Sequence, residues 1–124
     1  MRYSLLIFFI GASCFINTEA YTQKLSIEVY NKTGVTLDSV QIDAFYIGRL
    51  KNDSSTFVNG LNEFQRSGPW PLLRVRAVDD LGKSITNLSA CGTKAVTVKE
   101  GHFAFDIILN NAGLNRHLEL ISHR

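Results

Sequence analysis

Cys91, in the phrase Cys91-Gly92-Thr93, is the residue of this chain that most resembles a catalytic nucleophile. A thiol nucleophile needs a base, normally a histidine, that keeps it as the thiolate. The chain has three histidines, but none stands at a spacing that fixes it beside Cys91, and no Cys-x-x-Cys pair indicates disulfide exchange. A buried, inert thiol is therefore the favoured interpretation. A small cysteine-dependent enzyme or redox protein that uses Cys91 is the alternative.

The three histidines are the candidate metal ligands. His117 and His123 are six residues apart, so in an unbroken strand they point the same way but lie about 20 Å from each other. His102 begins the expected partner strand and could approach His123 at the open end of that hairpin. Two ligands without an acidic third residue nearby make a weak site. We therefore predict no metal and no cofactor.

Trp70, the only tryptophan, is the first candidate for a binding residue, because Pro69 and Pro71 hold it on both sides. A rigid exposed aromatic can stack on a sugar ring or anchor in a partner's pocket. A tryptophan folded back to seal the end of the domain is the favoured alternative. Arg74 and Arg76 share a strand face and could bind anionic sugars or an acidic partner, although such arginines more often only improve solubility.

The overall charge argues against several functions. Lysines and arginines number 13 and acidic residues 11, so the basic surface of a dedicated nucleic-acid binder is missing and we predict no nucleic-acid partner. Asp79 and Asp80 fall in an expected tight turn, where aspartates bond to their own backbone. No phosphate-binding glycine loop, nucleophile elbow or zinc-protease motif occurs. We therefore predict that the protein is not an enzyme.

Residues 1–20 are typical of an export signal. Arg2 gives a positive start, an apolar stretch runs from Leu5 to Ile16, and Thr18-Glu19-Ala20 precedes the expected cleavage. The apolar run is short for a bilayer span. We expect a single mature domain over residues 21–124, and a net charge that stays at +2 because the signal carries one charge of each sign.

A second cleavage is possible at Cys14, which follows Gly11-Ala12-Ser13 as in a lipoprotein signal. Gly11 stands where a leucine-like residue is usual, so a soluble exported protein, periplasmic or extracellular, is favoured over a lipid-anchored one. Contact with a membrane is expected only if Cys14 is lipidated. Asn-x-Ser/Thr sites begin at Asn31, Asn52 and Asn87, and they would carry glycans only in a eukaryotic host.

Alternation of apolar and polar residues with a period of two dominates the chain, and no segment carries a helical stripe. The expected strands cover residues 25–30, 40–48, 56–58, 62–65, 73–77, 83–88, 95–98, 103–109 and 114–120. Short strands at such spacing in about 100 residues favour an all-β fold, specifically a two-sheet antiparallel β-sandwich of immunoglobulin-like type. A small β-barrel is the alternative. Residues 67–71 contain two prolines, and we expect no regular element to cross them.

The last two expected strands form a hairpin. A four-residue loop over 110–113 sets Phe105 opposite Leu118 and keeps apolar residues on one face. The same register sets Asp106 opposite His117 on the other face, where a cross-strand ion pair is more plausible than a catalytic base and its orienting acid.

Several short motifs resemble a group of small exported bacterial proteins to which no activity is assigned. They are Asn31-Lys32-Thr33-Gly34, Asp38-Ser39-Val40, Ile47-Gly48, Asp53-Ser54-Ser55, Cys91-Gly92-Thr93, Phe105-Asp106-Ile107 and Leu118-x-Leu120-x-x-His123. The resemblance covers nearly the whole expected mature chain. It implies a bacterial host, in which the three glycosylation sites would be irrelevant.

Three functional hypotheses follow. The leading one is a non-catalytic exported β-sandwich that binds a protein or a glycan, and a protein is slightly favoured because one tryptophan is a small platform for carbohydrate. The second is the Cys91-dependent enzyme or redox protein. The third is a structural module of an envelope assembly, for which an exposed, unpaired strand edge would be the sign.

Overall fold

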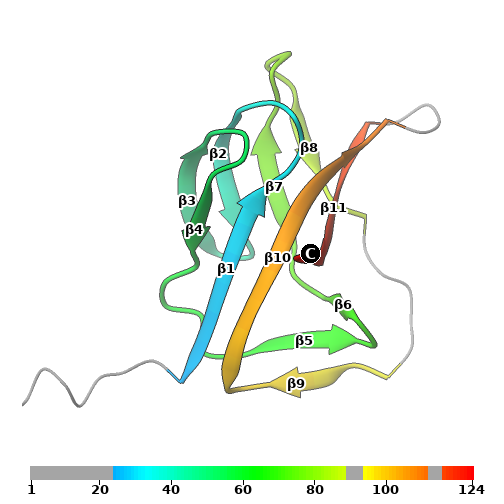
Figure 1. Cartoon of the computed structure of the whole chain (residues 1–124). Helices are drawn as coiled ribbons and strands as arrows, with labels where there is room; N and C mark the ends of the chain where they lie inside the picture. Colours follow the sequence, from blue (N-terminus) through cyan, green and yellow to red (C-terminus); the bar gives the residue numbers. More distant parts are fainter. Residues whose placement is uncertain (1–23, 89–93, 112–115) are drawn as a thin grey trace, which may run out of the picture.

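The computed structural model describes residues 24–88, 94–111 and 116–124, and these residues form an all-β structure (Figure 1). No helix in these three ranges is long and apolar enough to span a membrane. The strands are β1 (Leu25–Asn31), β2 (Leu37–Ile42), β3 (Phe45–Leu50), β4 (Ser55–Phe57), β5 (Phe64–Ser67), β6 (Trp70–Pro71), β7 (Val75–Val78), β8 (Ser84–Thr86), β9 (Val96–Val98), β10 (Gly101–Asn110) and β11 (His117–Ser122).

The strands form three open sheets, ordered β11-β10-β1-β4, β3-β2-β7-β8 and β6-β5-β9. All strand pairs are antiparallel except β1 and β10, which run parallel side by side. In Figure 1 the short third sheet lies across the lower ends of β1 and β10. The expected all-β class is confirmed, and none of these sheets closes into a barrel. The third sheet was not expected: strands were expected over 62–65 and 95–98, close to β5 and β9, but which strands pair depends on contacts between distant segments that the pattern does not show.

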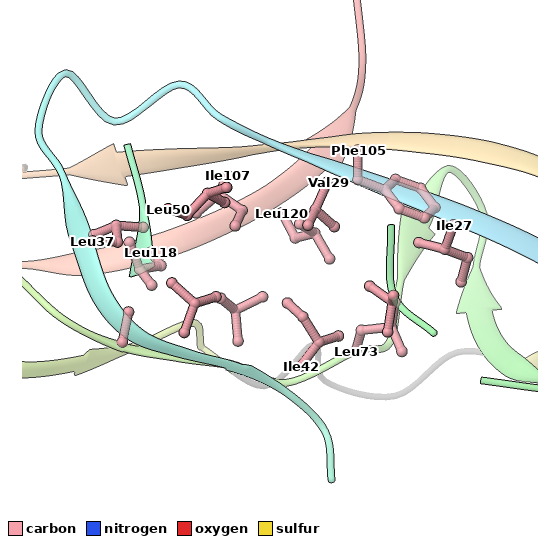
Figure 2. Close-up of a cluster of buried hydrophobic side chains, with 14 of the residues drawn as sticks. Ile27, Val29, Leu37, Ile42, Leu50, Leu73, Phe105, Ile107, Leu118 and Leu120 are labelled. Atoms are coloured by element: carbon pink, nitrogen blue, oxygen red, sulfur yellow. The ribbon is translucent and has the colours of Figure 1, made fainter. Parts of the chain in front are cut away.

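The core lies between the two four-stranded sheets. Along β1, the alternate residues Leu25, Ile27 and Val29 are buried, as the period of two predicted. Figure 2 shows side chains of β1, β10 and β11 meeting Leu37 and Ile42 of β2 from the opposite sheet. Burial of this apolar surface is the main favourable term for the fold.

The third sheet joins this core through aromatic rings. Phe64 of β5 makes edge-to-face contacts with Phe103 and Phe105 of β10, at ring-centroid distances of 5.2 and 5.9 Å. Contacts of this geometry add a specific attraction to the burial of the rings. They fix the β6-β5-β9 sheet, and with it Trp70, against the first sheet.

The single strand expected over 40–48 is wrong, because it is two strands. β2 and β3 are joined by the two-residue turn Asp43-Ala44, in which Asp43 has a φ of 50°. Its Oδ1 accepts a hydrogen bond from the backbone N–H of Arg74 at 2.7 Å. A turn of two residues leaves the alternation in phase, so the pattern alone could not show the break. The left-handed aspartate is the residue type that such turns use.

The expected register of the last hairpin is wrong by four residues. Phe105 lies opposite Ser122, and Asp106 lies opposite Ile121 instead of His117. The connection between β10 and β11 is correspondingly longer than four residues. Because side chains alternate with a period of two, a shift by any even number keeps the same residues on the buried face. The hydrophobic pattern therefore determined the face and left the register open.

Asn31, at the end of β1, is a fully buried polar residue. Its Nδ2 donates to the carbonyls of Val35 and Leu50, each at 2.8 Å. Its Oδ1 accepts from the backbone N–H and the hydroxyl of Thr33, at 3.0 and 2.6 Å. The side chain thus uses both donors and its acceptor to hold the turn after β1 against the end of β3. This first glycosylation motif has a structural role.

The breaker at residues 67–71 behaves as expected, since no strand crosses it. It forms the tight end of the β5–β6 hairpin, in which Ser67 pairs with Trp70 across Gly68 and Pro69. Gly68 has a φ of 59°, a left-handed conformation that glycine adopts at low cost. The turn presents Trp70 from a fixed backbone.

Candidate functional site

Both cysteines lie outside the described residues. The reactive-thiol hypothesis for Cys91, the lipidation hypothesis for Cys14 and the export signal over residues 1–20 therefore stay predictions.

The three histidines lie on different parts of the described structure. The His102 ring lies 6.2 Å from that of Phe57, while His117 Nε2 lies 3.5 Å from a carboxylate oxygen of Glu119. His123 lies elsewhere, against β1 and β10. Within the described ranges, no group of three or more His, Cys, Asp or Glu side chains could hold a metal ion.

His123 forms a cluster that the sequence did not predict. Its Nδ1 lies 2.6 Å from Oδ1 of the buried Asp106, and its ring stacks on Tyr30 with centroids 4.0 Å apart and planes 8° apart. Its backbone N–H donates to the carbonyl of Ala104. The expected partner of Asp106 was His117, and the four-residue register shift is the reason for the exchange.

The same cluster continues to Glu28 on β1. The Tyr30 hydroxyl donates to Glu28 Oε1 at 2.9 Å, and the Ser55 hydroxyl donates to Oε2 at 3.0 Å. The hydrogen bond to Glu28 raises the pKa of Tyr30 above its ordinary value, and partial desolvation and the charges of Glu28 and Asp106 act in the same direction. The cluster attaches His123, the residue after β11, to the neighbouring strands β10 and β1.

Trp70 is exposed, with 58% of its surface accessible, so the favoured interpretation of a folded-back ring does not describe it. It stands on β6, beside the end of β11 (Figure 1). Two recesses of about 240 and 260 Å³ flank its ring, and both are bordered by residues of β11 and the chain end after it. Because Trp70 and Ile121 border both recesses, the two recesses are neighbouring parts of one depression.

A third recess, of about 260 Å³, extends this depression toward Arg74. It shares Pro71, Asn87 and Leu88 with the first of the two Trp70 recesses. Leu88 is 69% exposed, the second large apolar side chain at this place. We call the joined recesses the β11 groove; β11 forms one side, and Trp70, Pro71, Asn87 and Leu88 form the other.

Asn87 holds the chain before β7 against the end of β8, where both segments border this groove. Its Nδ2 donates to the carbonyl of Leu73 at 2.7 Å, and its Oδ1 accepts from the N–H of Val75 at 2.9 Å. Its backbone forms a parallel bridge with Leu118 of β11. The third glycosylation motif is therefore also structural, and only Asn52 keeps an exposed asparagine at such a motif.

The predicted arginine pair is divided by the structure. Arg74 precedes β7 and reaches the β11 groove, whereas Arg76 lies within β7 on the outer face of its sheet, between the buried Val75 and Ala77. Sequence reasoning missed Leu88, because a single leucine at the end of an expected strand carries no signal for exposure.

Arg116 was also missed as a partner of the Asp79-Asp80 turn. Asp79 accepts from the backbone N–H groups of Leu81 and Lys83, as the turn predicted. Its other oxygen lies 3.1 Å from Arg116, which also contacts Asp80 at 2.9 Å. Because the Asp79 side chain is fully buried, this ion pair compensates an otherwise costly charge.

A smaller aromatic surface lies between β3 and β4, where the exposed Tyr46 and Phe57 border a recess of about 170 Å³.

Comparison of the chain with protein families, with curated proteins and with solved structures finds no match. The function is therefore argued from the geometry of the site.

Proposed function

We propose that this protein is a non-catalytic, exported binding protein of the periplasm or cell surface, built on an immunoglobulin-like β-sandwich, and that a protein partner docks in the β11 groove. The observation that carries the proposal is the exposed pair Trp70 and Leu88 bordering one continuous groove. Large apolar side chains that remain exposed together mark interaction surfaces more often than scattered single ones do.

The chemistry of the groove favours a protein over a glycan. Trp70 is a rigid anchor, since its backbone pairs with Ser67 and prolines stand on both sides of it. Aromatic anchors of this kind are enriched among the residues that dominate protein interfaces. Leu88 and Ile121 add aliphatic surface, which packs against apolar side chains and offers no hydrogen bond to sugar hydroxyls.

Two alternative functions, a structural module and a Cys91-dependent enzyme or redox protein, are tested by different observations. The β11 edge is also what a structural module of an envelope assembly would use, because an edge strand can pair with another chain. The Cys91 hypothesis is tested separately by thiol alkylation of the native protein: a slow, denaturant-dependent reaction contradicts an activated thiolate.

Site-specific crosslinking tests the proposed docking surface. A photoreactive amino acid is placed at Leu88 or, as the matched control, at Leu81, which is 67% exposed on the distant β7–β8 turn. Both proteins are exported in the source organism and irradiated. We expect one defined protein adduct from position 88 that Trp70→Ala abolishes and that position 81 lacks. Equal labelling from both positions, or none from position 88, would contradict the proposal.

A further inference from the structure

The recess between β3 and β4 lies where edges of the two four-stranded sheets come together. β4 is the edge of the first sheet opposite β11, and β3 is an edge of the second sheet. The two strands are neighbours in space, as Figure 1 shows. The recess of about 170 Å³ between them is lined by residues 45–47 and 56–59 and shares no lining residue with the β11 groove. We call it the β3–β4 recess.

Two aromatic side chains border this recess and stay open to solvent. Tyr46 of β3 is 72% exposed, and Phe57 of β4 is 47% exposed. The Tyr46 ring reaches along β3 to Gly48, where a Cβ atom would lie 3.6 Å from it. The ring therefore lies close to the strand and still keeps most of its surface accessible. Phe57 has the ring of His102 on one side, with the centroids 6.2 Å apart. The two strands thus present a pair of supported aromatic rings.

The turn after β4 places Asn59 at the rim of the recess. Gly60 has a φ of 90°, and the ring of Phe45 packs so closely against it that a Cβ atom there would lie 3.1 Å from the ring. On the other side of Asn59, the N–H of Val58 donates to the carbonyl of Ile27 at 2.9 Å. Both neighbours of Asn59 are therefore fixed, while its own side chain is exposed beside the recess.

The side-chain polar groups that border the recess are uncharged and available. The hydroxyls of Tyr46 and Thr56 and the amide of Asn59 make no hydrogen bond to another residue that the structure describes. The lining residues include no lysine, arginine, histidine, aspartate or glutamate. A ligand here meets hydrogen-bond donors and acceptors but no charge to balance its own.

We propose that the β3–β4 recess binds a neutral saccharide, a second binding function that is independent of the protein docking proposed for the β11 groove. A pyranose ring has apolar C–H faces and a rim of uncharged hydroxyl groups. Tyr46 and Phe57 stack on the C–H faces, and Thr56 and Asn59 bond to the hydroxyls. The recess is smaller than the roughly 300–1,000 Å³ of sites for drug-sized ligands, so it accepts a single sugar unit of a longer chain.

Other ligand classes fit the recess less well. An acidic sugar or a phosphate needs a cation, and Arg49, the arginine of β3, does not line the recess and lies 3.6 Å from Asp38. An apolar side chain of a protein partner would cover the hydroxyls and the amide without bonding to them. Polar groups that lose water and gain no partner cost free energy, which weakens such a complex.

The test begins with an array of neutral and uronic-acid-containing oligosaccharides, incubated with the whole protein. The neutral oligosaccharide that binds most strongly is then titrated to millimolar concentration while the NMR signals of the protein are followed. We expect shifts of the ring signals of Tyr46 and Phe57 and of the side-chain amide of Asn59. The ring signals of Trp70, in the separate β11 groove, should stay unchanged.

Substitutions separate ring stacking from hydrogen bonding. Tyr46→Ala should lower the affinity by about tenfold, because it removes a stacking ring, whereas Tyr46→Phe keeps the ring and should cost less than about threefold. Asn59→Ala removes the amide and should also weaken binding. Leu81→Ala, which removes an exposed apolar side chain on the distant β7–β8 turn, is the matched control and should leave the affinity unchanged. All four side chains are exposed or at the rim, and urea denaturation checks that each variant is folded.

Several outcomes would overturn the inference. Binding of no neutral oligosaccharide at millimolar concentration, or preference for the acidic ones, contradicts a neutral saccharide site. Equal affinity of folded Tyr46→Ala contradicts stacking in this recess. Loss of binding with Trp70→Ala instead of Tyr46→Ala assigns the saccharide to the β11 groove. Crosslinking from position 88 tests the protein partner separately, so either proposal fails without the other.

Discussion

Replacing Asn31 by alanine should destabilise the protein strongly, although asparagine-to-alanine changes are usually mild. The side chain is fully buried and makes four hydrogen bonds. After the change, the Val35 carbonyl keeps the Thr33 hydroxyl as a donor, whereas the Leu50 carbonyl loses its side-chain donor in a buried place. One unsatisfied buried group costs about 1–3 kcal/mol, and the lost bonds to Thr33 add to it.

We therefore expect Asn31→Ala to lower the free energy of unfolding by about 2–3 kcal/mol. For a domain of this size that corresponds to roughly 10–20 °C in the unfolding midpoint. Urea denaturation followed by circular dichroism measures the change directly, with unchanged slope as the sign that the transition stays two-state.

Asn52→Ala is the matched control, because it removes an exposed asparagine from the same kind of motif. Its Oδ1 accepts one hydrogen bond, from the N–H of Gly34 at 2.9 Å, which water can replace. We expect a loss below about 1 kcal/mol. Asn31→Ala within about 0.5 kcal/mol of the original protein would refute the reasoning that this side chain fixes the turn after β1.

Three further predictions concern single contacts. Glu28→Gln should lower the pKa of Tyr30 toward its ordinary value, because it removes the charge that opposes ionisation; NMR titration of the tyrosine ring carbons measures this. The raised pKa makes its stabilising contribution complete below about pH 10, the unfolded pKa, and lost as pH rises through the folded pKa. Arg116→Met should cost about 1–2 kcal/mol in urea denaturation, because it leaves the buried Asp79 carboxylate without its cation. In a eukaryotic secretory host, glycan should be found by mass spectrometry only at Asn52.

Each of these three predictions would be contradicted by a specific result. An unchanged Tyr30 titration in Glu28→Gln would mean that the carboxylate charge of Glu28 does not oppose ionisation of Tyr30. Arg116→Met as stable as the matched surface change Arg76→Met would mean that Asp79 does not need its partner. A glycan on folded protein at Asn31 or Asn87 would be incompatible with the buried bonds of those side chains.

The sequence by itself determined what depends on neighbours along the chain. Alternation along β1 predicted which residues are buried, and the Asp79 turn and the break before Trp70 followed from the local chemistry of aspartate, glycine and proline. These features need only the period of a strand and the preferred backbone angles of a residue.

Only the tertiary structure decided the contacts between distant segments. The register of β10 with β11 is one of several that bury the same residues, so the pairing of Asp106 with His123 instead of His117 could not be read from the pattern. The β11 groove likewise exists only because Trp70, Leu88 and the edge of β11 meet from three separate parts of the chain. Local periodicity sets which face of a strand is buried, but the packing of whole sheets sets which distant residues meet.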